Sequence, residues 1–209
     1  MTTWHRYVAL GDSFTVGIGD SVEGFAKLSA MDWLADALRQ ANPGLQYTNL
    51  AKSGLFVSEI REQQLETALA LEPDFVTLVA GANDLLKGRF NAAGWEQEFQ
   101  KLFEALSQSG AVVVTGGVPD FPLLKTLKES HQAGMTRIIT KANDMMRRLA
   151  DRYQVVFVDS WSISALSNQE DWSLDGVHLN SRGYFKFAQE MIEVLEQQLG
   201  TRLGTIEAP

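Results

Sequence analysis

A serine in a short polar turn is the first residue in the sequence that could carry chemistry. The segment Gly11-Asp12-Ser13-Phe14-Thr15 directly follows an apolar run. A serine hydroxyl is a weak nucleophile at neutral pH, so it needs a neighbouring base, and the base needs a group that fixes its orientation. Taken alone, a Gly-Asp-Ser triplet is more often a simple turn. The rest of the chain must therefore supply a histidine and a carboxylate.

One of the three histidines has a carboxylate at a suitable spacing. Asp175 and His178 are three positions apart and can face one way on a single turn, so the carboxylate can bind one ring nitrogen while the other points at Ser13. A structural interior histidine is the alternative interpretation of His178. His5, before the first apolar run, and His131, in a polar stretch that we expect to be a loop, are both expected on the surface.

Two further carboxylates follow apolar runs and compete with Asp175 for the same role. Asp12 is adjacent to Ser13, and because adjacent side chains diverge, we expect it to cap or hydrogen-bond the turn instead of serving as the acid of a triad. Asp159 is a comparable loop carboxylate to which the sequence assigns no role.

Two other loops hold groups that could donate hydrogen bonds to a developing negative charge. Gly54 would let a backbone N–H approach a substrate oxygen with no side chain between them. Asn83, within Gly81-Ala82-Asn83-Asp84, supplies a side-chain amide. Taken singly, Gly54 could end a helix and Asn83 could cap one. Brought together with Ser13, they would form an oxyanion hole.

These loops need a scaffold that makes them neighbours. Short runs rich in Val, Leu or aromatic residues alternate with longer stretches of helical period, which is typical of buried parallel strands in an α/β fold. The expected strands are Tyr7–Leu10, Gln46–Leu50, Phe75–Ala80, Ala111–Thr115 and Val155–Val158. We predict a three-layer α/β/α doubly wound, flavodoxin-like fold with a five-stranded parallel sheet in the order 2-1-3-4-5. In that order the loops carrying Ser13, Gly54 and Asn83 are adjacent.

Amphipathic helices are expected between the strands. Their apolar faces are Leu28, Met31, Leu34 and Leu38; Val57, Ile60, Leu65 and Leu69; Trp95, Phe99, Leu102 and Leu106; Ile138, Ala142, Met145 and Leu149; and Tyr184, Phe187, Met191 and Val194. Asn42-Pro43-Gly44 should stop the first helix.

Two loops have a composition that bears on a binding site. The fifth strand lies three positions from the first, so at about 4.8 Å per strand the His178 loop must reach back roughly 14 Å, and 160–174 is expected as a long connection without secondary structure. The loop that follows the fourth strand, 116–134, is apolar for a surface connection. It could form the wall or lid of an acyl pocket or simply pack on the core, and Trp161 and Trp172 allow the same two interpretations.

The motifs, taken in order, resemble the signature blocks of the SGNH hydrolases, also called GDSL-like lipases and esterases. The matching segments are Gly11-Asp12-Ser13, Gly54, Gly81-Ala82-Asn83-Asp84 and Asp175-Gly176-Val177-His178. The resemblance runs from the first expected strand to the last expected helix. The usual first block ends in Leu where this chain has Phe14, a variant also common among the proteins that it resembles.

The resemblance implies a role for each motif residue. Ser13 would be nucleophile and oxyanion donor, Gly54 and Asn83 further donors, His178 the base and Asp175 its orienting partner. It implies a serine esterase that cleaves a small or lipid-like acyl ester through an acyl-enzyme. An acyltransferase or thioesterase using the same residues, and a non-catalytic binding module with the same fold, are the alternatives.

Composition limits the remaining function classes. The 209 residues fit one domain, 1–209. The net charge of −8 comes without any basic stripe, so nucleic acid is not an expected partner. The chain has no cysteine, which removes thiolate chemistry. No cluster has metal-ligand spacing, so no metal is expected.

No cofactor and no membrane segment are expected either. Gly17 and Gly19 only partly match a dinucleotide fingerprint, because the third glycine is missing and the run does not open a helix. No apolar run approaches a membrane span, and the start of the chain does not have the pattern of a signal peptide, which predicts a cytoplasmic protein. Oligomeric state is not determined by the sequence.

Overall fold

The computed structural model describes residues 3–207, and its strands form one parallel sheet in the order β2-β1-β3-β4-β5. The strands are β1 (Arg6–Gly11), β2 (Gln46–Asn49), β3 (Phe75–Val79), β4 (Val112–Gly116) and β5 (Val156–Val158). The predicted order is confirmed, and each predicted strand boundary lies within one residue of the observed one. In the register of β1 with β3, Gly11 is paired with Val79, so the ends of these two strands lie side by side.

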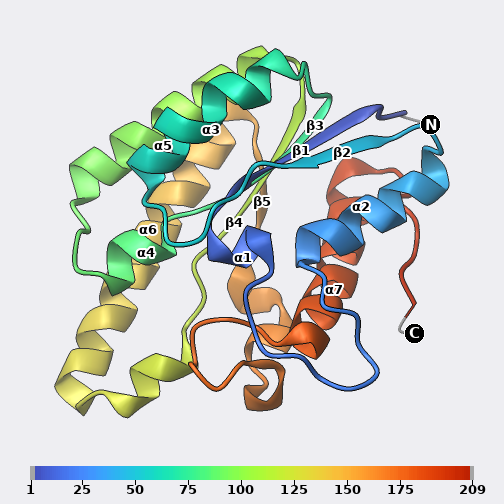
Figure 1. The fold of residues 1–209 in the computed structure, drawn as a ribbon. Coiled ribbons are helices and arrows are strands. Elements are labelled where there is room, and N and C mark those ends of the chain that lie inside the picture. The colour runs from blue at the N-terminus through green and yellow to red at the C-terminus, as the bar shows by residue number, and fades with distance from the viewer. Residues whose placement is uncertain (1–2, 208–209) are drawn as a thin grey trace.

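Helices cover both faces of this sheet, which confirms the three-layer α/β/α prediction (Figure 1). One layer holds α2 (Ala30–Ala41) and α7 (Ser181–Leu199), and the other holds α3 (Val57–Ala70), α5 (Ala92–Gln108) and α6 (Glu129–Tyr153). Two short helices, α1 (Ser13–Val16) and α4 (Ala82–Leu86), begin where β1 and β3 end. The carboxyl edge of the sheet therefore carries the motif loops, as this topology requires.

Local sequence explains where the first long helix begins and ends. Ser29 and Asp32 form a reciprocal capping box at the start of α2, with distances of 3.1 and 2.9 Å. The helix ends at Ala41, and Asn42 caps it by donating its amide to Leu38 O at 2.8 Å. The predicted stop at Asn42-Pro43-Gly44 is confirmed.

Some predicted core positions are wrong. Ile138 is 38% exposed and its neighbour Ile139 is buried. Leu65 and Leu69 are half-buried and pack against the core as predicted, while Gln64 and Ala68 beside them are more deeply buried. A period of 3.6 residues lets two adjacent positions fit one apolar stripe, and packing against neighbouring elements selects between them. The second strand, β2, is also not a buried strand, because it lies at the sheet edge and is half-exposed.

Two expected loops contain more secondary structure than their sequences suggested. The connection 160–174 is not structureless, because it holds three 3₁₀ turns, Ser160–Ser162, Ser164–Leu166 and Gln169–Asp171. Two of these turns are stabilised by side-chain caps, which sequence periodicity does not reveal. Asp159 accepts a hydrogen bond from Trp161 N, and Asn168 accepts one from Glu170 N.

The loop 116–134 is likewise shorter than expected. It contains a 3₁₀ helix, Pro122–Thr126, and α6 already begins at Glu129. His131 therefore lies in the first turn of a helix and not in a loop, although it is exposed as predicted. The polar start of α6 carries no apolar stripe, which hid the helix in the sequence.

Within residues 3–207, no helix has the length and the apolar character required to cross a membrane.

Candidate active site

The end of β1 presents Ser13 at the first position of α1. Asp12 caps this short helix by accepting a hydrogen bond from the Phe14 N–H at 3.2 Å, which confirms the capping role predicted for Asp12. Gly17 closes the helix in the left-handed conformation, with φ at 82°. The nucleophile candidate is thus held in a tight turn, with its side chain at the edge of a cavity.

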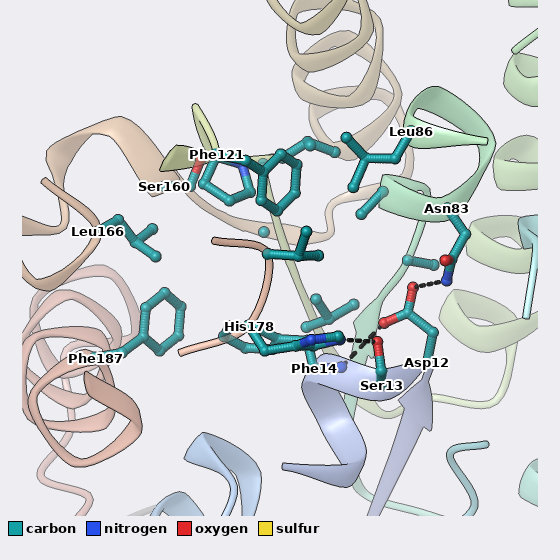
Figure 2. Close-up of a pocket in the computed structure, with 18 of the residues that line it drawn as sticks. Asp12, Ser13, Phe14, Asn83, Leu86, Phe121, Ser160, Leu166, His178 and Phe187 are labelled. Atoms are coloured by element: carbon teal, nitrogen blue, oxygen red, sulfur yellow. Dashed lines mark hydrogen bonds between the residues drawn. The ribbon is translucent and has the colours of Figure 1, made fainter. Parts of the chain in front are cut away.

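Asp175, His178 and Ser13 form a continuous line of hydrogen bonds. Asp175 Oδ2 lies 2.6 Å from His178 Nδ1. His178 Nε2 lies 2.8 Å from Ser13 Oγ, a bond that Figure 2 shows. An ionised carboxylate can only accept hydrogen bonds, so Nδ1 carries the ring proton and Nε2 is left to accept from the serine hydroxyl. The structure therefore brings these three predicted site residues together in the order that activates a serine.

The acid and the histidine lie in an irregular turn, without any helix at 175–178. Gly176 adopts φ 65°, which lets the chain fold back so that Asp175 Oδ1 accepts from the Val177 and His178 N–H groups at 2.9 and 3.0 Å. Partial burial raises the pKa of Asp175, but the hydrogen bonds from the His178 ring and from these two N–H groups outweigh it and hold the pKa below its ordinary value. Asp175 is thus ionised at neutral pH.

A small network holds the 172–180 segment that carries His178. Trp172 pairs with Leu179 in an antiparallel bridge, and Ser173 N donates to His178 O at 2.8 Å. Asp20 is tied to the same segment, because its Oδ2 accepts from Leu174 N and its N–H donates to Ser173 Oγ, both at 2.8 Å. These contacts bring the chain from beyond β5 back to the end of β1.

Asp171, directly before this segment, forms two ion pairs. Asp171 is fully buried and accepts from Arg182 at 2.8 Å and from Lys186 at 3.0 Å. Both cations lie in the first two turns of α7, so these ion pairs join the helix to the loop that precedes it. Sequence reasoning missed Asp171, because nothing in the local pattern distinguishes it from a surface acid.

The turn after β2 places Gly54 at the same cavity as Ser13. Gly54 has φ 84°, a conformation that side chains disfavour. Lys87 Nζ donates to the Gly54 carbonyl at 3.1 Å and so ties this turn to α4. Gly81 begins the turn before α4 with φ 103°, and a Cβ there would lie 2.7 Å from the Trp95 ring.

Asn83, on α4, lines the same cavity as Ser13, and its amide nitrogen makes two hydrogen bonds. Its Nδ2 atom donates to Asp12 Oδ2 and to Leu55 O, each at 3.0 Å, and the first of these bonds is drawn in Figure 2. An amide nitrogen has two hydrogens, so both are used. Asn83 thus connects the loops after β1, β2 and β3, and one of its N–H groups must change partner before it can bind a substrate oxygen.

Burial disfavours the ionised form of Asp12. It is 3% exposed, and this burial raises its pKa to about 6 against the opposing effect of the Phe14 N–H, the nearby His178 and the Asn83 amide. The carboxylate beside Ser13 is therefore costly to ionise, which the sequence did not indicate.

Gln64 is a further residue that the sequence analysis missed. It is buried on α3 and forms two hydrogen bonds to the backbone of Gly11. The Gln64 side chain accepts from the Gly11 N–H and donates to the Gly11 carbonyl, each at 2.9 Å. Gly11 is the last residue of β1, so Gln64 fixes the exit angle of the strand that carries Ser13. A polar residue on a helix gives no local sign of burial, so no signal in the sequence pointed to this contact.

The other histidines and loop acids lie elsewhere. His5 is exposed and faces Asp74 at 3.4 Å. Asp159 pairs with Arg147 at 2.9 Å in addition to capping the turn after β5. Neither residue lines the cavity beside Ser13.

The cavity beside Ser13 has a volume of about 350 Å³ and a largely apolar wall. Figure 2 shows Ser13, Asp12 and His178 at one side of it and Phe121, Leu166 and Ser160 at the other. Parts of both predicted loops form its wall, including Val118, Phe121 and Trp172. Trp161, in contrast, is 48% exposed and lies outside it. The arrangement offers an activated serine at the mouth of a pocket suited to an apolar group.

Comparison with known proteins identifies a family for this chain. Residues 9–185 match the model of the GDSL-like Lipase/Acylhydrolase family. The chain therefore belongs to this family, whose name denotes carboxylic ester hydrolases.

Part of the chain is also similar to a larger esterase. A multidomain esterase of Ruminococcus flavefaciens is 30% identical over 135 residues, which is 61% of this chain and 16% of that protein. The chain thus spans less than a fifth of that relative.

Solved structures share the fold. The lipase Lip_vut3 from a goat rumen metagenome has a TM-score of 0.73 at 19% identity, covering 90% of this chain and 96% of that one. The acetyl xylan esterase Axe2 of Geobacillus stearothermophilus has a TM-score of 0.72 at 17% identity, covering 97% of each chain. At these identities the likeness concerns the fold.

Proposed function

We propose that the chain is a serine esterase in which Ser13 attacks the substrate, His178 acts as general base and Asp175 orients His178. The observation that carries the proposal is the line of hydrogen bonds at 2.6 and 2.8 Å that ends on a hydroxyl at the edge of an apolar cavity. Family membership and the esterase and lipase names of the relatives support it.

The reaction then follows two steps. Ser13 Oγ bonds to the ester carbonyl carbon while its proton passes to His178 Nε2, and the tetrahedral intermediate collapses as His178 returns that proton to the departing alcohol. Water next attacks the acyl-enzyme, again giving a proton to His178, and the carboxylic acid is released with Ser13 restored. Asp175 stays ionised throughout and stabilises the imidazolium that forms in each step.

Charge on the intermediate needs donors near Ser13. We assign this role to the backbone N–H groups of Ser13 and Gly54 and to the side chain of Asn83. Because the Asn83 amide is held by Asp12 and Leu55 in the free protein, the oxyanion would replace one of these two acceptors.

The proposal is tested by hydrolysis of p-nitrophenyl acetate, butyrate and octanoate by the purified protein and by Ser13→Ala. Activity that is present in the wild type and absent from the variant is expected. Equal rates for the two proteins would contradict the role of Ser13. The matching acyl thioesters, and ester substrates with added alcohol acceptors, distinguish an esterase from a thioesterase or acyltransferase, since the preferred leaving group or acceptor gives the higher kcat/KM.

A further inference from the structure

The end of the connection from β2 to α3 is held at four consecutive residues, 54–57, by side chains from α4 and from the turn that follows it. The contacts are Gly54 O with Lys87 Nζ at 3.1 Å, Leu55 O with Asn83 Nδ2 at 3.0 Å, the Phe56 ring centroid with the Arg89 guanidinium at 4.4 Å, and Val57 N with Asp84 Oδ2 at 3.2 Å. The turn that carries Gly54 therefore depends for its position on the loop after β3.

Lys87 is the cation of this set that borders the cavity beside Ser13. Apart from the chain neighbours of Gly54, a Cβ atom on this glycine would have one atom within 4 Å among the described residues, the Lys87 Nζ at 3.5 Å. The space on this side of Gly54 is thus open except for the Lys87 ammonium. The ammonium lies where the cavity and the Gly54 backbone meet.

The Lys87 ammonium is not engaged by an acid. Within residues 3–207 Lys87 forms no ion pair, and its ammonium donates one hydrogen bond, to the Gly54 carbonyl. Because the donor is charged, this bond is stronger than one between two neutral groups. Lys87 is also exposed, so the protein core does not need its side chain. The contact that distinguishes Lys87 is therefore its hold on Gly54.

Building on the proposed oxyanion hole, we infer that Lys87 is a positioning residue for it: the Lys87 ammonium holds the Gly54 carbonyl and so keeps the Gly54 N–H directed at the oxyanion. Glycine has the freest backbone of all residues, so a glycine donor needs an outside contact to keep one direction. Asn83 must give up one of its two bonds to bind the oxyanion, whereas Lys87 keeps its bond to Gly54 throughout the reaction.

Loss of this hold should weaken one of the three proposed oxyanion donors without removing it. Removal of a donor costs about 10²–10³ in kcat. Asn83 and Asp84 still hold the residues next to Gly54, so Lys87→Met is expected to lower kcat by a smaller factor, about tenfold, which corresponds to about 1.4 kcal/mol. KM should stay unchanged, since the oxyanion forms only after attack.

Steady-state hydrolysis of p-nitrophenyl acetate by the wild type, Lys87→Met and Lys87→Arg measures this effect. Methionine keeps an unbranched apolar side chain and removes the donor, whereas arginine keeps a cationic donor and should restore most of the rate. Lys52→Met is the matched control, because Lys52 precedes Gly54 by two residues, is exposed and donates to Gln63 Oε1 at 3.5 Å instead. It should keep the wild-type kcat, and thermal unfolding checks that every variant is folded.

Inhibition by n-butylboronic acid tests the oxyanion hole separately from substrate binding. Its boron atom accepts an electron pair from Ser13 Oγ while the serine proton passes to His178, and no bond to boron breaks. The adduct is thus a tetrahedral anion that resembles the reaction intermediate. Lys87→Met should raise the inhibition constant by about the same tenfold factor by which it lowers kcat, and Lys52→Met should leave it unchanged.

Two results would overturn the inference about Lys87 and leave the esterase proposal intact. The first is a kcat of Lys87→Met equal to that of Lys52→Met. The second is a lower kcat of Lys87→Met with an unchanged inhibition constant for the boronic acid, which would place the defect away from the oxyanion. A wild type that hydrolyses the acetate no faster than Ser13→Ala would instead contradict the esterase proposal, and the inference would fall with it.

Discussion

The side-chain amide of Asn83 donates a hydrogen bond to the buried carboxylate of Asp12 over 3.0 Å. This bond joins the turn after β1, which carries the proposed nucleophile Ser13, to the turn after β3, which carries a predicted oxyanion donor. The second amide hydrogen goes to Leu55 O beside Gly54. The three loops of the candidate site are therefore fixed to one another in the free protein, and Asn83 can act as the proposed oxyanion donor only if one of these bonds changes partner.

Asn83→Ala is expected to lower kcat by about 10²–10³, a loss of about 3–4 kcal/mol in transition-state stabilisation, with a small effect on KM. The oxyanion forms only after attack, so the ground state loses little. Steady-state kinetics on p-nitrophenyl butyrate measure the effect, and thermal unfolding checks that the variant is folded. An unchanged kcat would remove Asn83 from the oxyanion hole.

Asp175→Asn is expected to keep the fold and lower kcat by about 10⁴, by analogy with the serine-protease triad. An amide can donate to His178 Nδ1 and so favour the wrong tautomer, and it no longer stabilises the imidazolium. Stopped assays with high enzyme concentration measure the residual rate. A loss below tenfold would leave Asp175 a purely structural role in the 175–178 turn.

Asp12→Asn should change the pH dependence of stability. Burial raises the pKa of Asp12 to about 6, above the roughly 3.9 of an unfolded chain, so the native state binds its proton more tightly. As pH rises from about 4 to 6, the unfolded chain releases this proton first and the native state loses stability, by on the order of 3 kcal/mol. The asparagine variant has no such loss.

Urea unfolding of both proteins at pH 4, 5, 6 and 7 measures this effect. The free energy of unfolding of Asp12→Asn minus that of the wild type is expected to increase across the series. The neighbouring Asp84, whose pKa burial also raises to about 6, is present in both proteins, so the part of its titration that does not depend on Asp12 cancels in the difference. A difference that stays constant with pH would show that Asp12 titrates normally.

Gln64→Leu is expected to destabilise the protein by about 1–3 kcal/mol, because it leaves the buried N–H and carbonyl of Gly11 without their side-chain partner. It should also reduce kcat, since Gly11 sets the exit of the strand that carries Ser13. Gln63→Leu, on the exposed face of the same helix, is the matched control. Equal Tm values for the two variants would contradict this role of Gln64.

The fold could be predicted from hydrophobic patterns in the sequence. Five short apolar runs alternating with amphipathic stretches predicted a parallel α/β sheet. The order 2-1-3-4-5 was the hypothesis, because it is the usual doubly wound arrangement of five strands. The motif residues Ser13, Gly54 and Asn83 fell after the first three strands, and that sheet order makes their loops neighbours.

Residues whose role depends on long-range contacts could not be predicted in the same way. Gln64 contacts a backbone 53 positions away, and a polar residue on a helix gives no local sign of burial. Asp171 is buried because Arg182 and Lys186 fold over it. Each of these facts exists only after the chain has folded.

The most direct test of the central claim is the site of covalent labelling by diethyl p-nitrophenyl phosphate, which phosphorylates an activated serine and releases p-nitrophenolate. Peptide mass spectrometry should find the diethylphosphoryl group on Ser13, with labelling absent from Ser13→Ala and strongly slowed in His178→Ala. Labelling of a different residue, or esterase activity that survives in Ser13→Ala, would contradict the assignment of Ser13 as the nucleophile.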